Sequence, residues 1–349
     1  MLFVPVSGAR GMGEYARSLA LATAASQRWP ALDIHFVVSQ QAPYAVDTPF
    51  ASTLLPSSPT FHTQEMRELI RSLRPSLVVF DNAGRTAQLR AAAASRARVV
   101  YVSSRPRQRR KAFRLGWMRI LDEHWIAYPE FVAGGFGPLE RIKLRLLRRP
   151  VVRFLDAILP MSDDGLAARM LERFSLKRGE YALVVPGGGT DHPGAENAPQ
   201  IVATAARELA KAGVPTLLVA AAEGTSVPGQ GDSLRTSPRM PMAELAELLR
   251  ASRIVVSNGG DTLLQAIASA RPCIAVPIAG DQAHRIARCE RAGLAIGAPL
   301  EAAAITREAV SLFRDESRRQ ALASRLAAAS VRNGMEVALE SIGRLSAPR

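Results

Sequence analysis

Residues 256–293 read VSNGGDTLLQAIASARPCIAVPIAGDQAHRIARCERAG and contain two successive strand-to-helix junctions. An apolar, β-branched run is followed by a Gly-Gly turn, and an apolar helical pattern then starts at Thr262. A second short apolar run over 274–276 leads to Asp281 and Gln282, where the next helical pattern begins. Short apolar strands that alternate with amphipathic helices predict a parallel sheet covered by helices on both faces.

The same alternation extends through the chain in two runs that meet near residues 160–180. The apolar runs that we read as strands cover residues 2–6, 34–38, 77–80, 99–102, 182–185, 216–219, 254–256 and 274–276. At 349 residues the chain is also too long for one ordinary core. We therefore expect an α/β protein with two doubly wound Rossmann-like domains facing a cleft, over residues 1–162 and 163–349. The last helices are expected to cap the second domain.

Composition indicates a globular protein of a reducing compartment. The chain is 48% hydrophobic and 22% charged, and its two cysteines, Cys273 and Cys289, give neither a disulfide framework nor a ligand cluster. The N-terminus reads as a buried first strand rather than a signal peptide, and no apolar run is long enough to span a bilayer. These features predict a cytoplasmic location.

The net charge of +14 is concentrated in one part of the chain. Residues 1–160 hold 23 Lys and Arg against 11 Asp and Glu, and residues 105–153 alone hold 13 against 4. A localised basic segment favours one anionic surface over nucleic acid, for which the sequence has no recognisable module. Within 105–121, bases are interleaved with large apolar residues, among them Phe113, Leu115, Trp117, Met118 and Leu121. That pattern suits a helix at the inner face of the cell membrane, or else an ordinary amphipathic helix with a solvated basic face.

Ligands of parallel α/β sheets bind beyond the carboxyl ends of the strands, and three glycine-bearing loops fall there. The first lies in VSGARGMGEYARSLALA, residues 6–22. Its G-x-x-G-x-G spacing does not match the dinucleotide fingerprint, so we reject a dinucleotide site. Glu14 lies in the first turn of the following helix, where it is either a carboxylate favoured by the helix dipole or a general base.

The other two loops suit phosphate. In YALVVPGGGTDHPGAENAPQI, residues 181–201, the run Gly187, Gly188, Gly189 and Thr190 follows a strand and lacks the Lys of a Walker loop. The alternative is a flexible surface loop. In the opening stretch, donors for a diphosphate are expected from Asn258, Gly259, Gly260, Asp261 and Thr262. Asp281 and Gln282 offer hydrogen bonds to a polyhydroxylated group, although ordinary helix capping explains each of these residues singly.

Taken with these motifs, SNGGDTLLQAIASARPCIAVPIAGDQ, LVVPGGGT and GMGEYARSLALA resemble the signatures of GT-B glycosyltransferases. The likeness includes the peptidoglycan N-acetylglucosaminyltransferase and related nucleotide-sugar hydrolases. The resemblance implies that the second and third loops hold the diphosphate, that the region of Met242 contacts the base, and that Asp281 and Gln282 hold sugar hydroxyls. Gln265 stands where the family usually has a ribose-binding Glu. Glu14 stands where it has a His, and is expected to be the general base, with Asp81 as the next candidate.

The resemblance implies transfer of a sugar from a nucleotide-diphosphate sugar, expected to be a UDP-sugar, to an acceptor hydroxyl. The acceptor would be a sugar, a small molecule or a membrane-borne lipid. Because no D-x-D pair stands at a convincing loop, we expect no metal and no other cofactor. The alternatives are a nucleotide-sugar hydrolase, in which water replaces the acceptor, and a non-catalytic nucleotide-sugar-binding protein.

Overall fold

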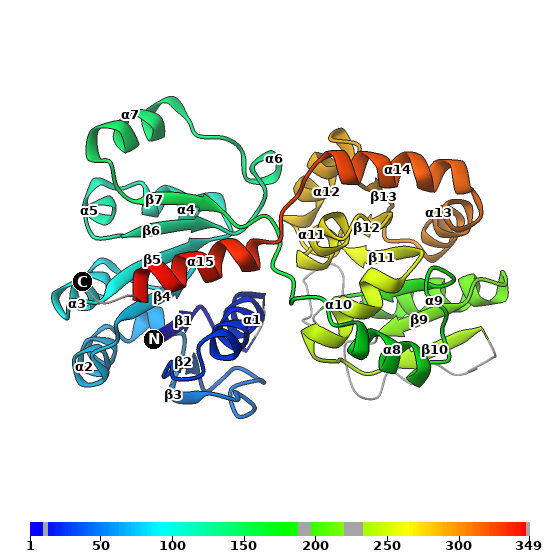
Figure 1. Cartoon of the computed structure of the whole chain (residues 1–349). Coiled ribbons are helices and arrows are strands. Elements are labelled where there is room, and N and C mark those ends of the chain that lie inside the picture. Colours follow the sequence, from blue (N-terminus) through cyan, green and yellow to red (C-terminus); the bar gives the residue numbers. More distant parts are fainter. Residues whose placement is uncertain (10–12, 188–196, 220–232, 347–349) are drawn as a thin grey trace. The chain divides into compact units, whose positions relative to one another are not determined.

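The computed structural model describes residues 1–9, 13–187, 197–219 and 233–346. These residues form two compact units: unit 1 comprises residues 1–158 and the C-terminal residues from 333 on, and unit 2 comprises residues 159–332 (Figure 1). Each unit is built on one sheet in which every strand pair is parallel. The expected class, an α/β protein with two doubly wound Rossmann-like domains, is therefore confirmed.

The sheet of unit 1 has seven strands in the order β3-β2-β1-β4-β5-β6-β7. Their bounds are β1 Leu2–Pro5, β2 His35–Ser39, β3 Ala51–Leu55, β4 Leu77–Asp81, β5 Arg98–Ser103, β6 Glu123–Ile126 and β7 Val151–Phe154. The order reverses between β1 and β4, so the loops after these two strands lead away in opposite directions and leave room for a ligand at their carboxyl ends.

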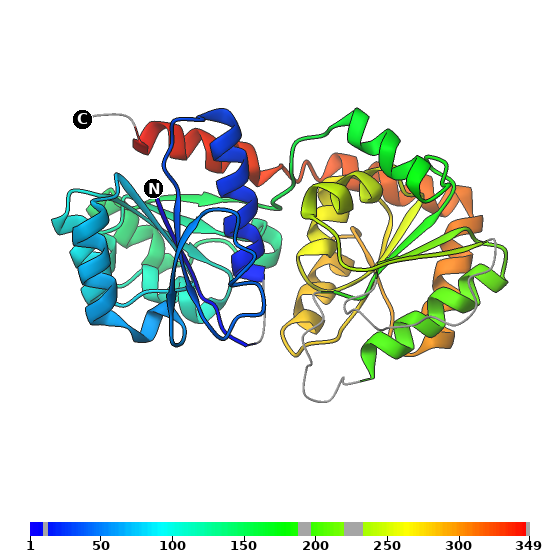
Figure 2. The same cartoon turned by 90° about the horizontal axis from the view of Figure 1, so that it is seen from below.

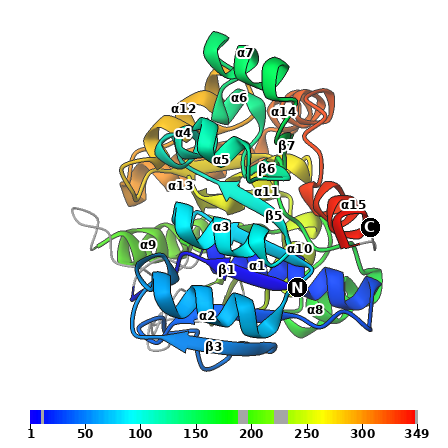
Figure 3. The ribbon, with the colours of Figure 1, turned by 90° about the vertical axis from the view of Figure 1, so that its left-hand side faces the viewer.

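Alternating side chains of these strands form two cores, one on each face. On one face, Phe3, Val79 and Val100 pack with α1 (Gly13–Arg28) and α15 (Gly334–Ser346), which lie beside each other in Figure 2. On the other face, Val4 and Phe80 pack with α2 (Thr63–Leu73) and α3 (Thr86–Ala94), which run side by side in Figure 3. The short elements of this unit are η1 Pro59–Phe61, α4 Pro106–Ala112, α5 Leu115–Met118, α6 Glu130–Ala133 and α7 Pro138–Leu147.

The C-terminal helix α15 belongs to unit 1, so the expectation that all residues from 163 to 349 form the second domain is wrong. Its side chains Met335, Leu339 and Ile342 are part of the same core cluster as β1 and α1. The start of the helix is tied to the chain just after β7, because the Gly334 N–H donates to the Ala157 carbonyl at 2.7 Å. An amphipathic pattern predicts which face of a helix is buried but not which sheet covers it.

The sheet of unit 2 has six strands in the order β10-β9-β8-β11-β12-β13. Their bounds are β8 Ala182–Val185, β9 Thr216–Val219, β10 Leu234–Ser237, β11 Ile254–Asn258, β12 Cys273–Val276 and β13 Ile296–Gly297. The helices are α8 Asp164–Arg173, α9 Ala198–Lys211, α10 Met242–Ala251, α11 Asp261–Ala268, α12 Gln282–Arg291, α13 Ala302–Arg314 and α14 Glu316–Ala328. One face of the sheet packs on α9 and α13, which lie together in Figure 2. The order reverses between β8 and β11, as it does between β1 and β4.

The apolar residues of 105–121 do not form an interfacial helix. The segment folds as the two short helices α4 and α5, and Phe113, Trp117, Met118 and Leu121 are all buried. Trp117 donates its indole N–H to Thr86 Oγ1 at 2.9 Å and meets Tyr101 edge to face. Among the large apolar residues of the segment, only Leu115 is exposed. Among the described helices, none is both long and apolar enough to cross a membrane.

Candidate functional site

Two of the predicted phosphate loops meet at the carboxyl edge of the unit 2 sheet, where β8 and β11 are neighbours. Gly187 follows β8 with φ +116°, and a Cβ built on it would lie 2.1 Å from Nδ2 of Asn258 at the end of β11. Only glycine therefore fits this position, both for its backbone conformation and for its space. The adjoining predicted residues Gly188, Gly189 and Thr190 lie outside the described residues.

Hydrogen bonds inside the protein hold the loops after β11 and β12 together. The Gly260 N–H donates to Asn258 Oδ1 at 3.0 Å. Oε1 of Gln282 accepts the Gly259 N–H at 3.2 Å and the Ile278 N–H at 3.0 Å. Because the Gln282 side chain is buried, its oxygen fixes the spacing of the two loops, a role that the sequence analysis did not anticipate.

Arg285 reinforces this arrangement from α12. Its buried guanidinium donates to the Gly259 carbonyl and, at 3.1 Å, to Oδ2 of Asp281. The Asp281 carboxylate is more than half exposed, at 57% of its side-chain surface. Asp281 is therefore held by a cation on one side while it stays open to solvent and to a ligand on the other.

The helix α11 begins directly at the Gly-Gly turn. Asp261 and Thr262 form its first turn and are half-buried, and the first backbone N–H groups of any α-helix have no acceptor within the helix. One turn further, the buried Gln265 lies with Nε2 3.9 Å from Sδ of Met242 on α10. Among the described residues, the structure thus brings the Gly-Gly turn predicted for the diphosphate together with Gln265 and Met242, predicted for the ribose and the base.

In unit 1, Glu14 is joined to residues that follow the neighbouring strands β4 and β5. Asn82 Nδ2 donates to Glu14 Oε1 at 2.8 Å and to Ser104 Oγ at 2.5 Å. The Ser104 N–H donates back to Asn82 Oδ1 at 3.0 Å. Asn82 has φ +53°, a left-handed conformation that Asn tolerates better than most residues. The carboxylate is therefore held in place at the strand-order reversal of this sheet.

Sequence reasoning did not single out Asn82 or Ser104. Their position could have indicated a role in the site, since each is a polar residue that closely follows a predicted apolar strand. Asp81, named as the alternative base, is fully buried and accepts two hydrogen bonds from Arg17, at 2.9 Å and 2.8 Å. That geometry makes Asp81 part of a buried structural ion pair rather than a base for a substrate.

Two tyrosines lie close to Glu14. The Tyr44 ring stacks on Tyr15 with centroids 4.0 Å apart, and both rings are buried. Burial, and to a smaller extent the Glu14 carboxylate, raise the pKa of Tyr44, so the phenol remains protonated. Within the described residues the Tyr44 hydroxyl has no hydrogen-bond partner. The Tyr44 hydroxyl is thus a protonated group within electrostatic range of the Glu14 carboxylate.

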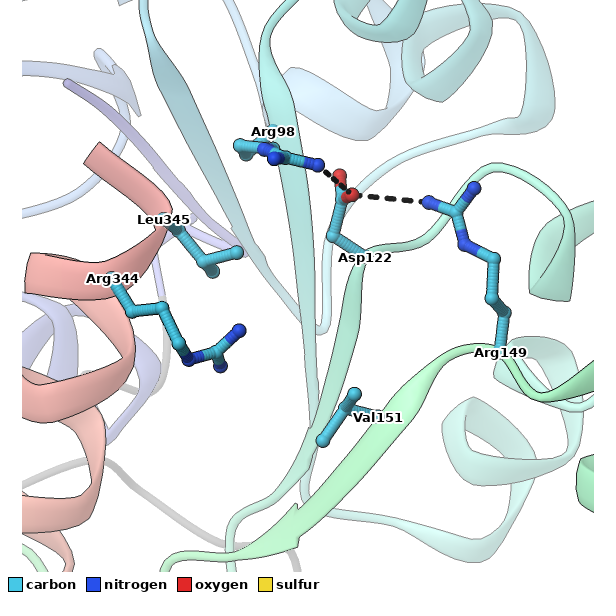
Figure 4. A pocket seen from close by; sticks show the side chains of 6 residues that line it. All are labelled: Arg98, Asp122, Arg149, Val151, Arg344 and Leu345. Atoms are coloured by element: carbon cyan, nitrogen blue, oxygen red, sulfur yellow. Dashed lines mark hydrogen bonds and ion pairs between the residues drawn. The ribbon is translucent and has the colours of Figure 1, made fainter. Parts of the chain in front are cut away.

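A hollow of about 350 Å³ in unit 1 lies at the other edge of the sheet (Figure 4). It is lined by the starts of β5 and β7 and by α15, through Arg98, Val151 and Leu345. Figure 4 shows the Arg98 and Arg149 guanidinium groups directed at Asp122, with one hydrogen bond of 3.0 Å from each. Because α/β ligand sites form at the carboxyl ends of strands, this hollow is not the candidate site.

No protein-family model matches the chain, and no curated protein matches it significantly. Solved structures do match it over nearly its whole length. UGT2 of Phytolacca americana, complexed with UDP-2fluoro-glucose and pterostilbene, has a TM-score of 0.66 and 14% identity over 99% of this chain and 100% of that chain. The spinosyn forosaminyltransferase SpnP has a TM-score of 0.65 and 13% identity over 99% of each chain.

A UDP-glucosyltransferase from Polygonum tinctorium capable of glucosylating indoxyl, in complex with 3,4-dichloroaniline, has a TM-score of 0.67 and 13% identity. That match covers 100% of this chain and 98% of the other. The protein therefore has the two-domain GT-B fold of these glycosyltransferases, as the resemblance in its sequence implied. Among the described residues, no three His, Cys, Asp or Glu side chains are grouped to hold a metal ion.

Proposed function

We propose that the protein is a glycosyltransferase that moves a sugar from a nucleotide-diphosphate sugar, most simply a UDP-sugar, to an acceptor hydroxyl. The observation that carries the proposal is the likeness to glycosyltransferases over 98–100% of both chains. The UGT2 structure is a complex with UDP-2fluoro-glucose, and the Polygonum tinctorium enzyme is a UDP-glucosyltransferase, which supports a UDP-sugar donor.

In this proposal the donor binds at the carboxyl edge of the unit 2 sheet. The diphosphate accepts hydrogen bonds from N–H groups at the start of α11, where the helix dipole also favours negative charge. Asp281, held by Arg285 yet exposed, accepts hydrogen bonds from sugar hydroxyls. Gln265 contacts the ribose of the nucleotide, and Met242 contacts its base. Gln282 supports the site by fixing the two loops rather than by direct contact through its oxygen.

Glu14 acts as the general base. Its carboxylate removes the proton of the acceptor hydroxyl while the acceptor oxygen forms a bond to the anomeric carbon of the sugar. The bond from that carbon to the phosphate oxygen breaks, and the nucleoside diphosphate leaves with the electron pair. The hydrogen bond from Asn82 holds the carboxylate in position, and positioned base catalysis contributes on the order of 10²–10⁴-fold to the rate. No step of this scheme needs a metal ion, and we propose that the reaction runs without one in the cytoplasm.

Two observations keep a second function open, that of a non-catalytic nucleotide-sugar-binding protein. Glu14 takes the place of the His that the resemblance implies, and Gln265 takes the place of a carboxylate. A neutral amide binds ribose hydroxyls without the charge-assisted strength of a Glu. Such a protein would bind a nucleotide sugar and leave it intact.

The test is a binding and turnover screen. Nucleoside diphosphates and their sugars are titrated into the full-length protein by calorimetry, and the products are then analysed with and without acceptor extracts. The proposal expects binding of a nucleoside diphosphate and release of it only when an acceptor is present. Free sugar released without an acceptor would identify a hydrolase, binding without any turnover would identify a sensor, and no binding at all would refute the donor site.

A further inference from the structure

The helix α7 carries an exposed aliphatic stripe. The side chains of Leu139, Ile142 and Leu146 are 71%, 54% and 76% exposed. Their spacing of three and four residues places them on one face of the helix. No residue of α7 is fully buried, and contiguous apolar surface of this kind marks an interaction site in soluble proteins.

The outward orientation of the stripe is fixed by hydrogen bonds on the other side of the helix. Glu140 accepts from the Arg109 guanidinium at 2.7 Å, and Lys143 donates to the Phe113 carbonyl at 3.1 Å. Arg109 is itself buried and also donates to the carbonyl groups of Ala133, at the end of α6, and of Gly134 and Gly135, which follow it. These hydrogen bonds fix α7 on the rest of unit 1, with the apolar stripe facing solvent.

Exposed cations lie on the same helix as the stripe and directly after it. Arg141, Arg145 and Arg148 are exposed, and none of the three forms an ion pair within the described part of the chain. The only acid of the helix, Glu140, is already paired with Arg109. Arg149 is not counted, because it pairs with Asp122. Figures 1 and 3 show α7 at the outer end of the unit 1 sheet, beyond β7.

We propose that the α7 face, made of Leu139, Ile142 and Leu146 with Arg141 and Arg145, docks on an anionic lipid bilayer. A second copy of this chain would bring like charges against these arginines, whereas an anionic bilayer offers phosphate groups to the cations and acyl chains to the aliphatic side chains. An apolar stripe together with a basic rim supplies the two signals that reversible membrane attachment requires.

This surface lies within the basic segment 105–153 that the sequence singled out, but its apolar residues are different, because those of 105–121 are mostly in the core and the exposed stripe lies at 138–147. The proposal does not rest on glycosyl transfer. If the protein binds lipid but transfers no sugar, the membrane proposal holds and the proposed function fails. If it transfers sugar but binds no lipid, the opposite is true.

The experiment is co-sedimentation of the full-length protein with vesicles of phosphatidylcholine alone or mixed with phosphatidylglycerol. One variant replaces the stripe, Leu139→Ser with Ile142→Ser and Leu146→Ser. A second changes the charge, Arg141→Glu with Arg145→Glu. The matched controls are Val46→Ser with Phe61→Ser, which removes exposed apolar side chains elsewhere, and Arg71→Glu with Arg90→Glu, which changes the net charge equally.

We expect the wild-type protein to bind the anionic vesicles, and to bind less as salt rises from about 0.1 M to about 1 M, where the screening length falls from about 10 Å to about 3 Å. Each α7 variant should lower the partition coefficient at least ~10-fold at low salt, while both controls stay near wild type. All replaced side chains are exposed, so unchanged thermal unfolding checks the fold. Absent binding to anionic vesicles, or equal loss in controls and α7 variants, would overturn the proposal. So would a dimer in sedimentation velocity that the stripe variant dissociates.

Discussion

Asn82 fixes the Glu14 carboxylate through one hydrogen bond, so base strength and base position can be tested separately. We expect Glu14→Gln to lower turnover about 100-fold or more while the affinity for UDP stays the same, because the amide cannot take the proton. Asn82→Ala should lower turnover less, about 10-fold, because the base remains but is no longer held. Turnover is measured by release of UDP, and affinity by calorimetry.

The control for this pair is Glu68→Gln, which neutralises an exposed carboxylate on α2 of the same unit. It should leave both turnover and affinity unchanged. Near wild-type turnover of Glu14→Gln would reduce Glu14 to a residue that stabilises the start of α1. A loss of UDP affinity in the same variant would mean that Glu14 acts on the donor instead.

The buried pair of Arg17 and Asp81 predicts a large effect on stability. Both side chains are at most 5% exposed, and two hydrogen bonds join them. Arg17→Met removes the cation that is hydrogen-bonded to the buried Asp81 carboxylate, and breaking a buried ion pair in this way typically costs about 3–5 kcal/mol of the free energy of unfolding. The change in the free energy of unfolding is measured by urea denaturation. The exposed pair of Lys211 and Glu208 provides the comparison, since Lys211→Met should change stability by less than about 1 kcal/mol.

His124 on β6 predicts a pH dependence of stability. The side chain is fully buried with Nε2 2.8 Å from Ser103 Oγ, and burial, with a smaller effect of Arg109, lowers the pKa of His124 to about 3. The unfolded chain has the ordinary value near 6.5 and therefore binds more protons than the folded chain between these two values. The free energy of unfolding should fall as the pH decreases through that range, by up to about 1.4 kcal/mol per pH unit.

The contribution of His124 is isolated with His124→Gln, which does not titrate. In urea denaturation below about pH 6.5, this variant should lose stability with a smaller slope than the wild type. His284→Gln, at an exposed position, should keep the wild-type slope. Equal slopes for His124→Gln and the wild type would show that other groups account for the acid sensitivity.

At the scale of elements, the turn from β11 into α11 depends on small residues. A Cβ on Gly260 would lie 2.8 Å from Asn258 Oδ1 and would displace the side chain that organises the turn. We expect Gly260→Val to weaken UDP binding at least ~10-fold, a cost of about 1.4 kcal/mol. Gly280→Ala is the matched control in the neighbouring loop, where an added Cβ meets nothing within 4 Å. Undiminished UDP affinity in Gly260→Val, measured by calorimetry, would remove the turn from the site.

The central strands and the glycine loops could be predicted because their signals are local. Apolar runs such as 77–80 and 254–256 correspond to β4 and β11, and Gly187 owes its identity to one backbone angle and one neighbour. Five strands were missed: β3 is mostly exposed, β13 has only two residues, and β6, β7 and β10 each contain a charged residue. Their side chains lack the apolar runs that mark strands buried on both faces.

Other features needed the tertiary structure. The bond from Asn82 to Glu14 depends on β1 and β4 being neighbours, which no local pattern encodes. The sequence alone does not distinguish a Gln282 whose oxygen binds backbone N–H groups from one whose amide binds a ligand. Trp117 and Phe113 lie among arginines along the chain, and only the packing of α4 and α5 against the sheet turns them inward. Interleaved bases and aromatics therefore predict amphipathicity, but not what covers the apolar face.

At the scale of the whole molecule, the chain leaves unit 1 after residue 158 and returns to it at residue 333. The returning helix α15 fills part of the core above β1 and β4. Its buried apolar side chains are Met335, Ala338, Leu339, Ile342 and Leu345, and Gly343 lies close against the Trp29 ring. Unit 1 is therefore incomplete until the last residues of the chain have folded, whereas the described core of unit 2 lies within residues 159–332.

This connectivity predicts that ending the chain after Arg332 unfolds unit 1 and spares unit 2. Each large aliphatic side chain of α15 contributes about 1.5–3 kcal/mol when buried, so the four together approach the 5–15 kcal/mol that stabilises a whole domain. Calorimetry of the truncated chain should show one transition, that of unit 2, and UDP binding should persist. Ending the chain after Ser346 keeps α15 complete and should leave both transitions in place. If the shorter chain kept both transitions as well, the core on that face of the unit 1 sheet would not depend on α15.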